Sequence, residues 1–360
     1  MKRVGSIPPS TLAVAAVVLL ALVVRLGAIA VDDGYSPQHD SLDYDRHARS
    51  IAERGSYPEA IRVVAPDGGP TAFRPPGYPV FLATVYEATG NSATAGRIAN
   101  ALLGALAVLL TYHVARELLS RRVALVAAAF AAFYPPLVSL SLELYSEPLF
   151  LVLMLGSVLA ALRFRPDPRL GMAALAGLLT GGTMLARPNG VILIPFIAWA
   201  LWRPPGRSGR SLAAPAIAVL IAALALTPWI ARNEIVLDRF VPLSTGAGFN
   251  LAGVYNDEAR DDERFEAAWR LPIRIETYDD IYAVPDQREI DLDDRLRERG
   301  LDYAQEHPGY VAEVVFWSAL RSLNLADAGT ASASGLVSER GIGTEITRAE
   351  PAGFFIAAAL

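Results

Sequence analysis

The sequence predicts an all-α polytopic membrane protein, and three observations support this fold class. The chain of 360 residues is 53% hydrophobic and only 19% charged, whereas about a quarter of the residues of a soluble domain carry a charge. Residues 11–30 form an almost wholly apolar run, and about 20 such residues cross the roughly 30 Å core of a bilayer as a helix. Further apolar runs follow at residues 98–115, 123–142, 149–162, 170–186, 191–202 and 211–230.

Arginine and lysine clusters between the apolar runs predict the orientation of the chain, because cytoplasmic loops carry an excess of these residues. Placing the clusters on the cytoplasmic side puts the N-terminus inside and residues 31–94 and 232–352 outside. It also makes residues 170–202 a hairpin of two short spans that turns outside at "ARPNG". The clusters are Lys2 and Arg3; Arg116, Arg121 and Arg122; Arg163, Arg165 and Arg169; and Arg203, Arg207 and Arg210.

The predicted organisation has three parts. Residues 11–231 form the transmembrane region, which includes the first outer loop, residues 31–94, with its surface helices. Residues 232–352 form a second outer segment of α or α/β structure, and residues 353–360 begin a further transmembrane helix. Half a span cannot satisfy its backbone groups across a bilayer, so we expect C-terminal helices beyond this sequence. The chain has no cysteine, and therefore no disulfide or thiolate metal site.

The first outer loop begins with "HDSLDYDRHARS", residues 39–50. A helix over residues 41–54 would place Tyr44, Ala48, Ile51 and Ala52 on one apolar face, as in a helix that lies on the membrane surface. Asp40 would then be the N-cap, with Asp43 at N3, which resembles a capping box. A second interpretation makes Asp40 a general base beside the bilayer surface. The two are compatible, because a cap also fixes the side chain.

A second short apolar helix is predicted over residues 78–88, after "FRPPGYP". The prolines exclude a helix at residues 74–76, so Arg74 lies at the junction. Its guanidinium can bind phosphate oxygens through two parallel hydrogen bonds. The alternative is an arginine that reaches up to lipid headgroups, and the sequence leaves both open.

Several stretches in order resemble the family 39 glycosyltransferases, which are type C (GT-C) membrane transferases akin to protein O-mannosyltransferases and to the aminoarabinose transferase that modifies lipid A. An aspartate after the first span is followed by "GSY" and "FRPPGYPVFLA". The resemblance covers residues 12–253, and its further parts are "RIANALLGALAVLLTYHVAREL", "YPPLVSLSLELYSEPLF", "LARPNGVILIP" and "TPWIARNEIVLDRFVPLSTGAGFNL".

The resemblance implies a GT-C helix bundle in a bacterial inner membrane, with the active site on the outer face. It implies a polyprenyl-phosphate sugar as donor and a hydroxyl of a glycan, lipid or protein as acceptor. Asp40 matches the family's catalytic aspartate, and Arg74 stands roughly where the family has a basic phosphate contact. No nucleotide is required, in keeping with the absence of a Gly-rich phosphate loop, and nothing in the sequence suggests nucleic acid.

Other ionisable residues are secondary candidates. Glu143 and Glu147 would lie at the outer ends of spans, where they bind a divalent cation, position the acceptor or only complement a helix N-terminus. The sequence requires no cofactor and leaves a divalent cation open. Arg187 and Arg232 are candidate donor-phosphate contacts or interfacial anchors, while Arg25, inside the first span, either faces a groove or reaches outward. The remaining candidate substrate or metal contacts are His39, Asp43 and Tyr44.

Two alternative functions stay open at this point. A membrane transporter or lipid flippase would show matched halves with broken helices at mid-membrane, whereas the charged residues here collect at the outer ends of the spans. A non-catalytic envelope scaffold would have no need of the acidic first loop. Both comparisons favour the glycosyltransferase.

Overall fold

The computed structural model describes residues 9–32, 34–202, 212–263 and 265–322. Within these ranges the protein is helical, and the only extended pairing is a single antiparallel bridge between Glu59 and Pro70. The all-α prediction is therefore confirmed for the described residues. The Lys2–Arg3 pair, the cluster at residues 203–210 and the start of a further span at residues 353–360 lie outside them.

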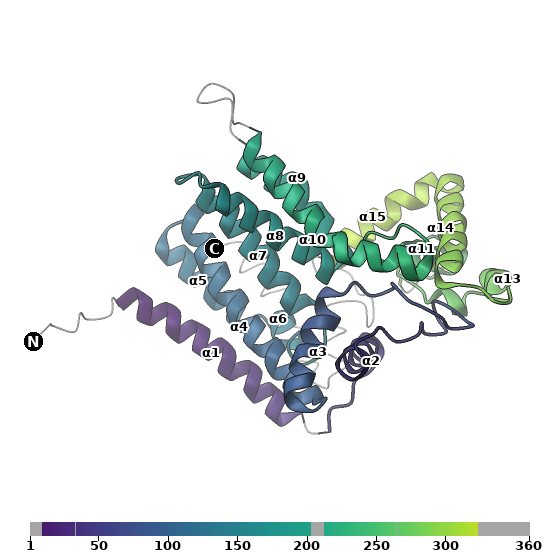
Figure 1. The fold of residues 1–360 in the computed structure, drawn as a ribbon, viewed down its shortest axis with the longest axis horizontal. Helices are drawn as coiled ribbons and strands as arrows, with labels where there is room; N and C mark the ends of the chain where they lie inside the picture. The colour runs from purple at the N-terminus through teal and green to yellow at the C-terminus, as the bar shows by residue number, and fades with distance from the viewer. Residues whose placement is uncertain (1–8, 33, 203–211, 264, 323–360) are drawn as a thin grey trace, which may run out of the picture. The chain divides into compact units, whose positions relative to one another are not determined.

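The chain forms two compact units (Figure 1). The first unit comprises Met1–Ser56 and Pro75–Asn233, and the second comprises Tyr57–Arg74 and Glu234–Leu360. The division at residue 233 lies close to the predicted one, but residues 57–74 of the first outer loop group with the later segment. Each unit is described separately below.

The first unit is a row of packed helices. In this row α1 packs on α4, α4 on α7 and α7 on α8, while α5 packs on α1 and α4 (Figure 1). The helices are α1 (Pro9–Val31), α2 (His39–Arg54), α3 (Gly77–Thr89), α4 (Ala93–Leu118), α5 (Arg121–Phe133), α6 (Pro135–Ser139), α7 (Glu147–Phe164), α8 (Leu170–Ala186), the 3₁₀ turn η1 (Pro188–Ile192), α9 (Leu193–Leu201) and α10 (Ala213–Leu237).

Four of these helices, α1, α4, α7 and α10, are long and apolar enough to cross a membrane. The chain is therefore an integral membrane protein. The segments at Leu170–Ala186 and Pro188–Leu201 are shorter apolar helices, as the short predicted hairpin requires. The prediction of one span over residues 123–142 was wrong. Pro135 and Pro136 end α5 at Phe133 and start the short α6, because proline lacks the N–H that would continue the helix.

Small residues bring α8 and α10 into close contact. A Cβ added at Gly177 would lie 2.3 Å from the carbonyl oxygen of Ala218, and one at Gly181 would lie 2.9 Å from that of Ala222. The glycines stand one helical turn apart and let the two backbones touch, which is a common way to pack apolar helices within a membrane. A side chain at either position would force these helices apart.

The second unit is built on α14 and the segments it holds. Two carboxylates one turn apart on α14 bind backbone N–H groups. Buried Glu289 accepts from the Ala72 N–H at 2.7 Å and from the Thr245 hydroxyl at 2.5 Å. The helices of this unit are α11 (Ala247–Val254), α12 (Asp257–Arg260), η2 (Pro272–Arg274), η3 (Glu276–Tyr278), α13 (Asp279–Tyr282), α14 (Glu289–Glu306) and α15 (Pro308–Ser322).

Asp293 is the second of these carboxylates. It accepts from the Gly248 and Phe249 N–H groups at 2.8 and 3.1 Å, at the start of α11. Burial raises the pKa of Asp293 to about 7, and these two hydrogen bonds oppose the rise only in part. Gly248 is required here, because a Cβ would lie 1.9 Å from the Asp293 carbonyl oxygen.

We expect Asp293→Asn to stabilise the protein at pH 8. We also expect it to remove the part of the pH dependence of the free energy of unfolding that comes from Asp293. Because the pKa of Asp293 is raised in the folded protein, its contribution to stability is present below the ordinary aspartate pKa and is lost as the pH rises through about 7. The free energy of unfolding that is lost in this way is at most about 4 kcal/mol. Asparagine keeps the acceptor oxygen and removes the charge.

Thermal unfolding of the full chain in detergent from pH 5.5 to 8.5 measures this effect. The control is Asp294→Asn on the same helix, a more exposed carboxylate that pairs with Arg297. The control should keep the parent's pH dependence. A parent protein as stable at pH 8 as at pH 6 would contradict the prediction.

Candidate functional site

The helix that carries Asp40 begins two residues earlier than an Asp40 cap requires. α2 starts at His39, its N-cap is Gln38, and the cap side chain makes no hydrogen bond. The prediction of Asp40 as N-cap, with Asp43 at N3, was therefore wrong. Asp40 lies in the first turn, where its charge faces the positive end of the helix dipole. Its side chain is exposed.

His39, immediately before Asp40, has a φ of +47°. A non-glycine residue rarely adopts this left-handed conformation, which costs on the order of 1 kcal/mol or more and persists only where the surroundings impose it. Strain of this kind occurs often at functional sites. Here it sets the direction in which the chain enters α2 beside Asp40.

One face of α2 is apolar as predicted and packs on α3. Tyr44 and Ala48 are buried against Tyr78 and Leu82, with the Tyr44 and Tyr78 rings edge to face at 4.9 Å. Ile51 and Ala52 pack partly buried at the rim of the same cluster. The predicted pair of short helices, α2 and α3, is confirmed.

The same helix also buries polar side chains. Asp43 lies 3.3 Å from Arg46 and 3.4 Å from His47, all within one turn. Asp45 accepts from the Tyr86 hydroxyl of α3 at 2.5 Å and pairs with Arg49 at 2.7 Å.

Burial, together with the hydrogen bond to Asp45, raises the pKa of Tyr86 far above its usual value. Tyr86 therefore stays protonated and remains a donor. Asp43 and Asp45 are fixed by neighbours on their own helix and on α3, whereas Asp40, in the first turn, is exposed.

Glu143 fixes the N-terminal turn of α2. It lies in the non-helical segment between α6 and α7, and its Oε2 accepts from the Tyr35 hydroxyl at 2.6 Å and the Ser41 hydroxyl at 2.5 Å. Ser41 follows Asp40 directly in the chain. The structure therefore connects Glu143 to the candidate base through its neighbour, in a positioning role.

Two side chains of α4 hold the segment that carries Glu143. The Arg97 Nε donates to the Leu142 carbonyl at 2.6 Å. The Asn100 amide donates to the carbonyls of Glu143 and Tyr145 at 2.8 and 3.1 Å. Arg97 also pairs with Asp32 and lies 4.1 Å from the Tyr35 ring centroid. These two roles were not predicted from the sequence, although "RIAN" places two polar residues one turn apart at the outer end of an apolar run.

Three further predicted residues gather around Ser146. Its hydroxyl accepts from the Tyr44 hydroxyl at 3.0 Å and from Arg187 at 3.1 Å. The same hydroxyl donates to the Glu147 carboxylate at 3.5 Å. Arg187 also pairs with Glu147 at 2.5 Å. Tyr44, Glu147 and Arg187 thus meet at one point where α2, α7 and α8 approach.

The other two predicted cations have different contacts. Arg232, on α10, stacks 5.1 Å from the Trp229 ring centroid and donates to Asn233 at 3.0 Å. Arg74 belongs to the second unit, where its guanidinium lies 5.0 Å from the Phe73 ring centroid.

Candidate metal ligands do not converge in the part of the chain that the structure describes. No group of three or more histidine, aspartate or glutamate side chains there has the arrangement to hold an ion. Glu143 and Glu147 are instead engaged by the hydroxyl groups and the arginine named above. A role for a divalent cation stays a prediction.

Fold and site together define a class: a helical membrane protein with a fixed polar cluster and an exposed carboxylate at the end of its bundle. Residues 73–231 match the sequence family described as dolichyl-phosphate-mannose-protein mannosyltransferase. This stretch contains most of the predicted motifs. The resemblance to the mannosyltransferase-like family of GT-C membrane glycosyltransferases is thereby confirmed.

Solved structures of the oligosaccharyltransferase from Archaeoglobus fulgidus are similar in the course of the chain. The structure tethered to an acceptor peptide with the NVT sequon has a TM-score of 0.47 and 14% identity over 97% of this chain and 38% of that chain. The complex with zinc and sulfate has the same score, 13% identity and coverages of 96% and 39%. The complex with an inhibitory peptide and a dolichol-phosphate has a TM-score of 0.47 and 14% identity over 97% of this chain and 36% of that chain.

This chain therefore spans less than two fifths of the length of those proteins. No curated protein matches it in sequence.

We expect Glu143→Ala to destabilise the first unit by about 2 kcal/mol or more, because it leaves two partly buried hydroxyl groups without their acceptor. Glu143→Gln keeps one acceptor oxygen and should lose less than half as much. Thermal unfolding of the full chain in detergent measures both effects. Glu87→Ala, an exposed glutamate on α3, is the matched control. Unchanged unfolding of Glu143→Ala would exclude the positioning role.

Proposed function

We propose that this protein is an integral membrane glycosyltransferase that transfers a sugar from a polyprenyl-phosphate donor to an acceptor hydroxyl on the outer face of the membrane. The observation that carries the proposal is the family match over residues 73–231, with its description of transfer from a lipid phosphate. The arginine and lysine pattern supports a cytoplasmic N-terminus. A bacterial inner membrane is the setting that the resemblance implies.

The proposed reaction is a single displacement. The acceptor oxygen forms a bond to the anomeric carbon while the bond from that carbon to the phosphate oxygen breaks, and the lipid phosphate leaves. Asp40 takes the proton of the acceptor hydroxyl. Such general base catalysis typically contributes about 10²–10⁴ in rate. An exposed carboxylate on a helix whose buried face is locked by hydrogen bonds fits this role, because a base must be held at a fixed position.

The growing negative charge of the leaving phosphate requires a fixed cation, which stabilises the transition state more than the ground state. Arg74, Arg187 and Arg232 are the predicted contacts. Arg187 is partly exposed and held by Glu147 and Ser146, so its guanidinium needs little further ordering to bind an anion. Acceptor and sugar are named only by class: a hydroxyl of a glycan, lipid or protein, and a hexose or pentose.

We expect Asp40→Asn to lower the rate of transfer by about 10²–10⁴, because asparagine cannot accept the proton. The assay uses the full-length protein in vesicles, radiolabelled mannose on polyprenyl phosphate as donor, and envelope membranes lacking the protein as acceptor. Glu53→Gln, at the other end of α2, where Glu53 binds Asn91, should transfer at the parent rate.

Transfer by Asp40→Asn at the parent rate would exclude Asp40 as the base. A parent protein that moves the labelled lipid across the membrane with its sugar still attached would support the flippase instead.

We expect Arg74→Ala to raise the KM for the donor about 10-fold or more, since a charge-assisted hydrogen bond contributes about 1.5–3 kcal/mol. The control is Arg62→Ala, an exposed arginine in the same loop. Donor titration in the vesicle assay separates KM from kcat. An unchanged KM would remove Arg74 from the phosphate site while leaving the role of Asp40 intact.

A further inference from the structure

Arg25 is a buried cation within the first transmembrane helix. Its side chain is 1% exposed, so the structure answers the question the sequence left open: Arg25 faces inward. An arginine has five N–H donors. Nη1 donates to the carbonyls of Ala21 and Ala132 at 3.0 Å, and Nη2 donates to those of Ala131 and Leu137 at 3.5 and 3.4 Å.

These contacts explain why a charge is tolerated at this depth. Ala131 and Ala132 lie in the last turn of α5, where carbonyls have no partner within the helix and the dipole is negative. Arg25 supplies the missing donors. Four of its five N–H groups are thereby engaged by backbone carbonyls.

Among the residues that the structure describes, the fifth donor, Nε–H, has no partner, and neither has the hydroxyl of Ser141, which is fully buried. Gly104 of α4 makes room for both atoms. A Cβ at position 104 would lie 2.6 Å from the Arg25 Nε and 2.9 Å from the Ser141 Oγ. Leaving a buried polar group unpaired costs roughly 1–3 kcal/mol, so two such groups at one place call for an acceptor.

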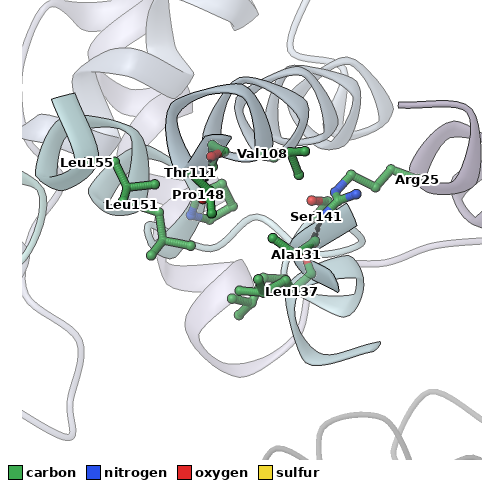
Figure 2. Close-up of a pocket in the computed structure, with 12 residues that line it drawn as sticks. Arg25, Val108, Thr111, Ala131, Leu137, Ser141, Pro148, Leu151 and Leu155 are labelled. Carbon is green, nitrogen blue, oxygen red and sulfur yellow. Dashed lines mark hydrogen bonds between the residues drawn. The ribbon is translucent and has the colours of Figure 1, made fainter. Parts of the chain in front are cut away.

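A cavity of about 60 Å³ adjoins these two groups. Figure 2 shows Arg25 and Ser141 on one side of it and Leu151 and Leu155 of α7 on the other. The remaining walls are almost wholly apolar, and the Thr111 hydroxyl is already bonded to the Ala107 carbonyl at 2.8 Å. The cavity therefore has one polar end and one hydrocarbon end.

Its size and lining disfavour water as the whole content. One water requires roughly 10–15 Å³ measured in this way, and apolar cavities stay dry. A water between Arg25 and Ser141 would leave the leucine end empty. A ligand with an acceptor oxygen at one end and a hydrocarbon chain behind it would fill both ends.

We propose that this cavity binds an ester-linked acyl chain of a membrane phospholipid, with the ester carbonyl oxygen accepting from the Arg25 Nε and the Ser141 hydroxyl. A carbonyl oxygen has two lone pairs and can accept both hydrogen bonds. Arg25 stands six residues before the end of α1, which is about 9 Å along the helix. This depth suits an ester carbonyl below the headgroups better than a phosphate.

The test compares two lipids on the delipidated full chain in detergent. One is phosphatidylglycerol with ester-linked chains, and the other is its ether-linked analogue of equal chain length, which lacks the carbonyl. Binding to the folded protein raises the unfolding temperature. We expect a saturable rise of several degrees with the ester lipid and less than half of it with the ether lipid. Equal shifts would refute recognition of the carbonyl.

Two variants test whether the shift in unfolding temperature comes from lipid bound in this cavity. Ser141→Ala should abolish the difference between the lipids while stabilising the lipid-free protein, because it deletes an unpaired buried hydroxyl. Leu155→Phe should abolish the shift by filling the apolar end. Leu106→Phe, at an exposed position on α4, is the control and should keep the shift.

The remaining outcomes overturn the proposal. A full ester-lipid shift that persists in both Ser141→Ala and Leu155→Phe would mean that the lipid binds elsewhere and not in this cavity. A third arm uses polyprenyl phosphate. A shift by that lipid which depends on Ser141, without one by phosphatidylglycerol, would assign the cavity to a polyprenyl phosphate instead.

Discussion

The structure of the first unit depends on how the protein satisfies the backbone of residues 140–146. This segment is not helical, yet it lies among helices built to face lipid. Carbonyl groups without partners there are costly, and irregular backbone at membrane depth is tolerated only where protein satisfies it. Arg97 and Asn100 supply the donors from α4. Both side chains are buried, so their own polar groups depend on these carbonyls in return.

The candidate site follows from this arrangement. With its carbonyls bound, the segment presents Glu143 to the start of α2 and Ser146 to Tyr44 and Arg187. A helix as polar as α2 would not stay in place through apolar contacts alone. Its buried polar face is held by side chains of residues 140–146 and of α3, and Asp40 stands in the first turn of this fixed helix. In the same way, Arg25 donates to backbone carbonyls at the end of α5 that have no partner within the helix.

The sequence could predict the parts of this fold that periodicity and apolar length determine. The two short surface helices, the apolar face with Tyr44 and Ala48, and the long spans were all apparent from the residues. The break at Pro135 was not, because its flanks are as apolar as a span. The partners of Glu143 lie about 100 residues away, and local spacing carries no signal for such pairs. The predicted helix start was two residues too late, because a cap is decided by backbone angles, such as the positive φ of His39, that the sequence does not reveal.

The hydroxyl of Ser146 fixes a direction within the polar cluster. A serine hydroxyl carries one proton and two lone pairs. Tyr44 and Arg187 occupy the lone pairs, so the proton is left for Glu147. Donation therefore runs one way, from the phenol through the serine to the carboxylate. If Arg187 released Ser146 to bind an anion, one lone pair of the serine would lose its donor, but the direction of donation would stay the same, because a carboxylate can only accept. The contact between α2 and the start of α7 through Tyr44 and Ser146 therefore does not require Arg187.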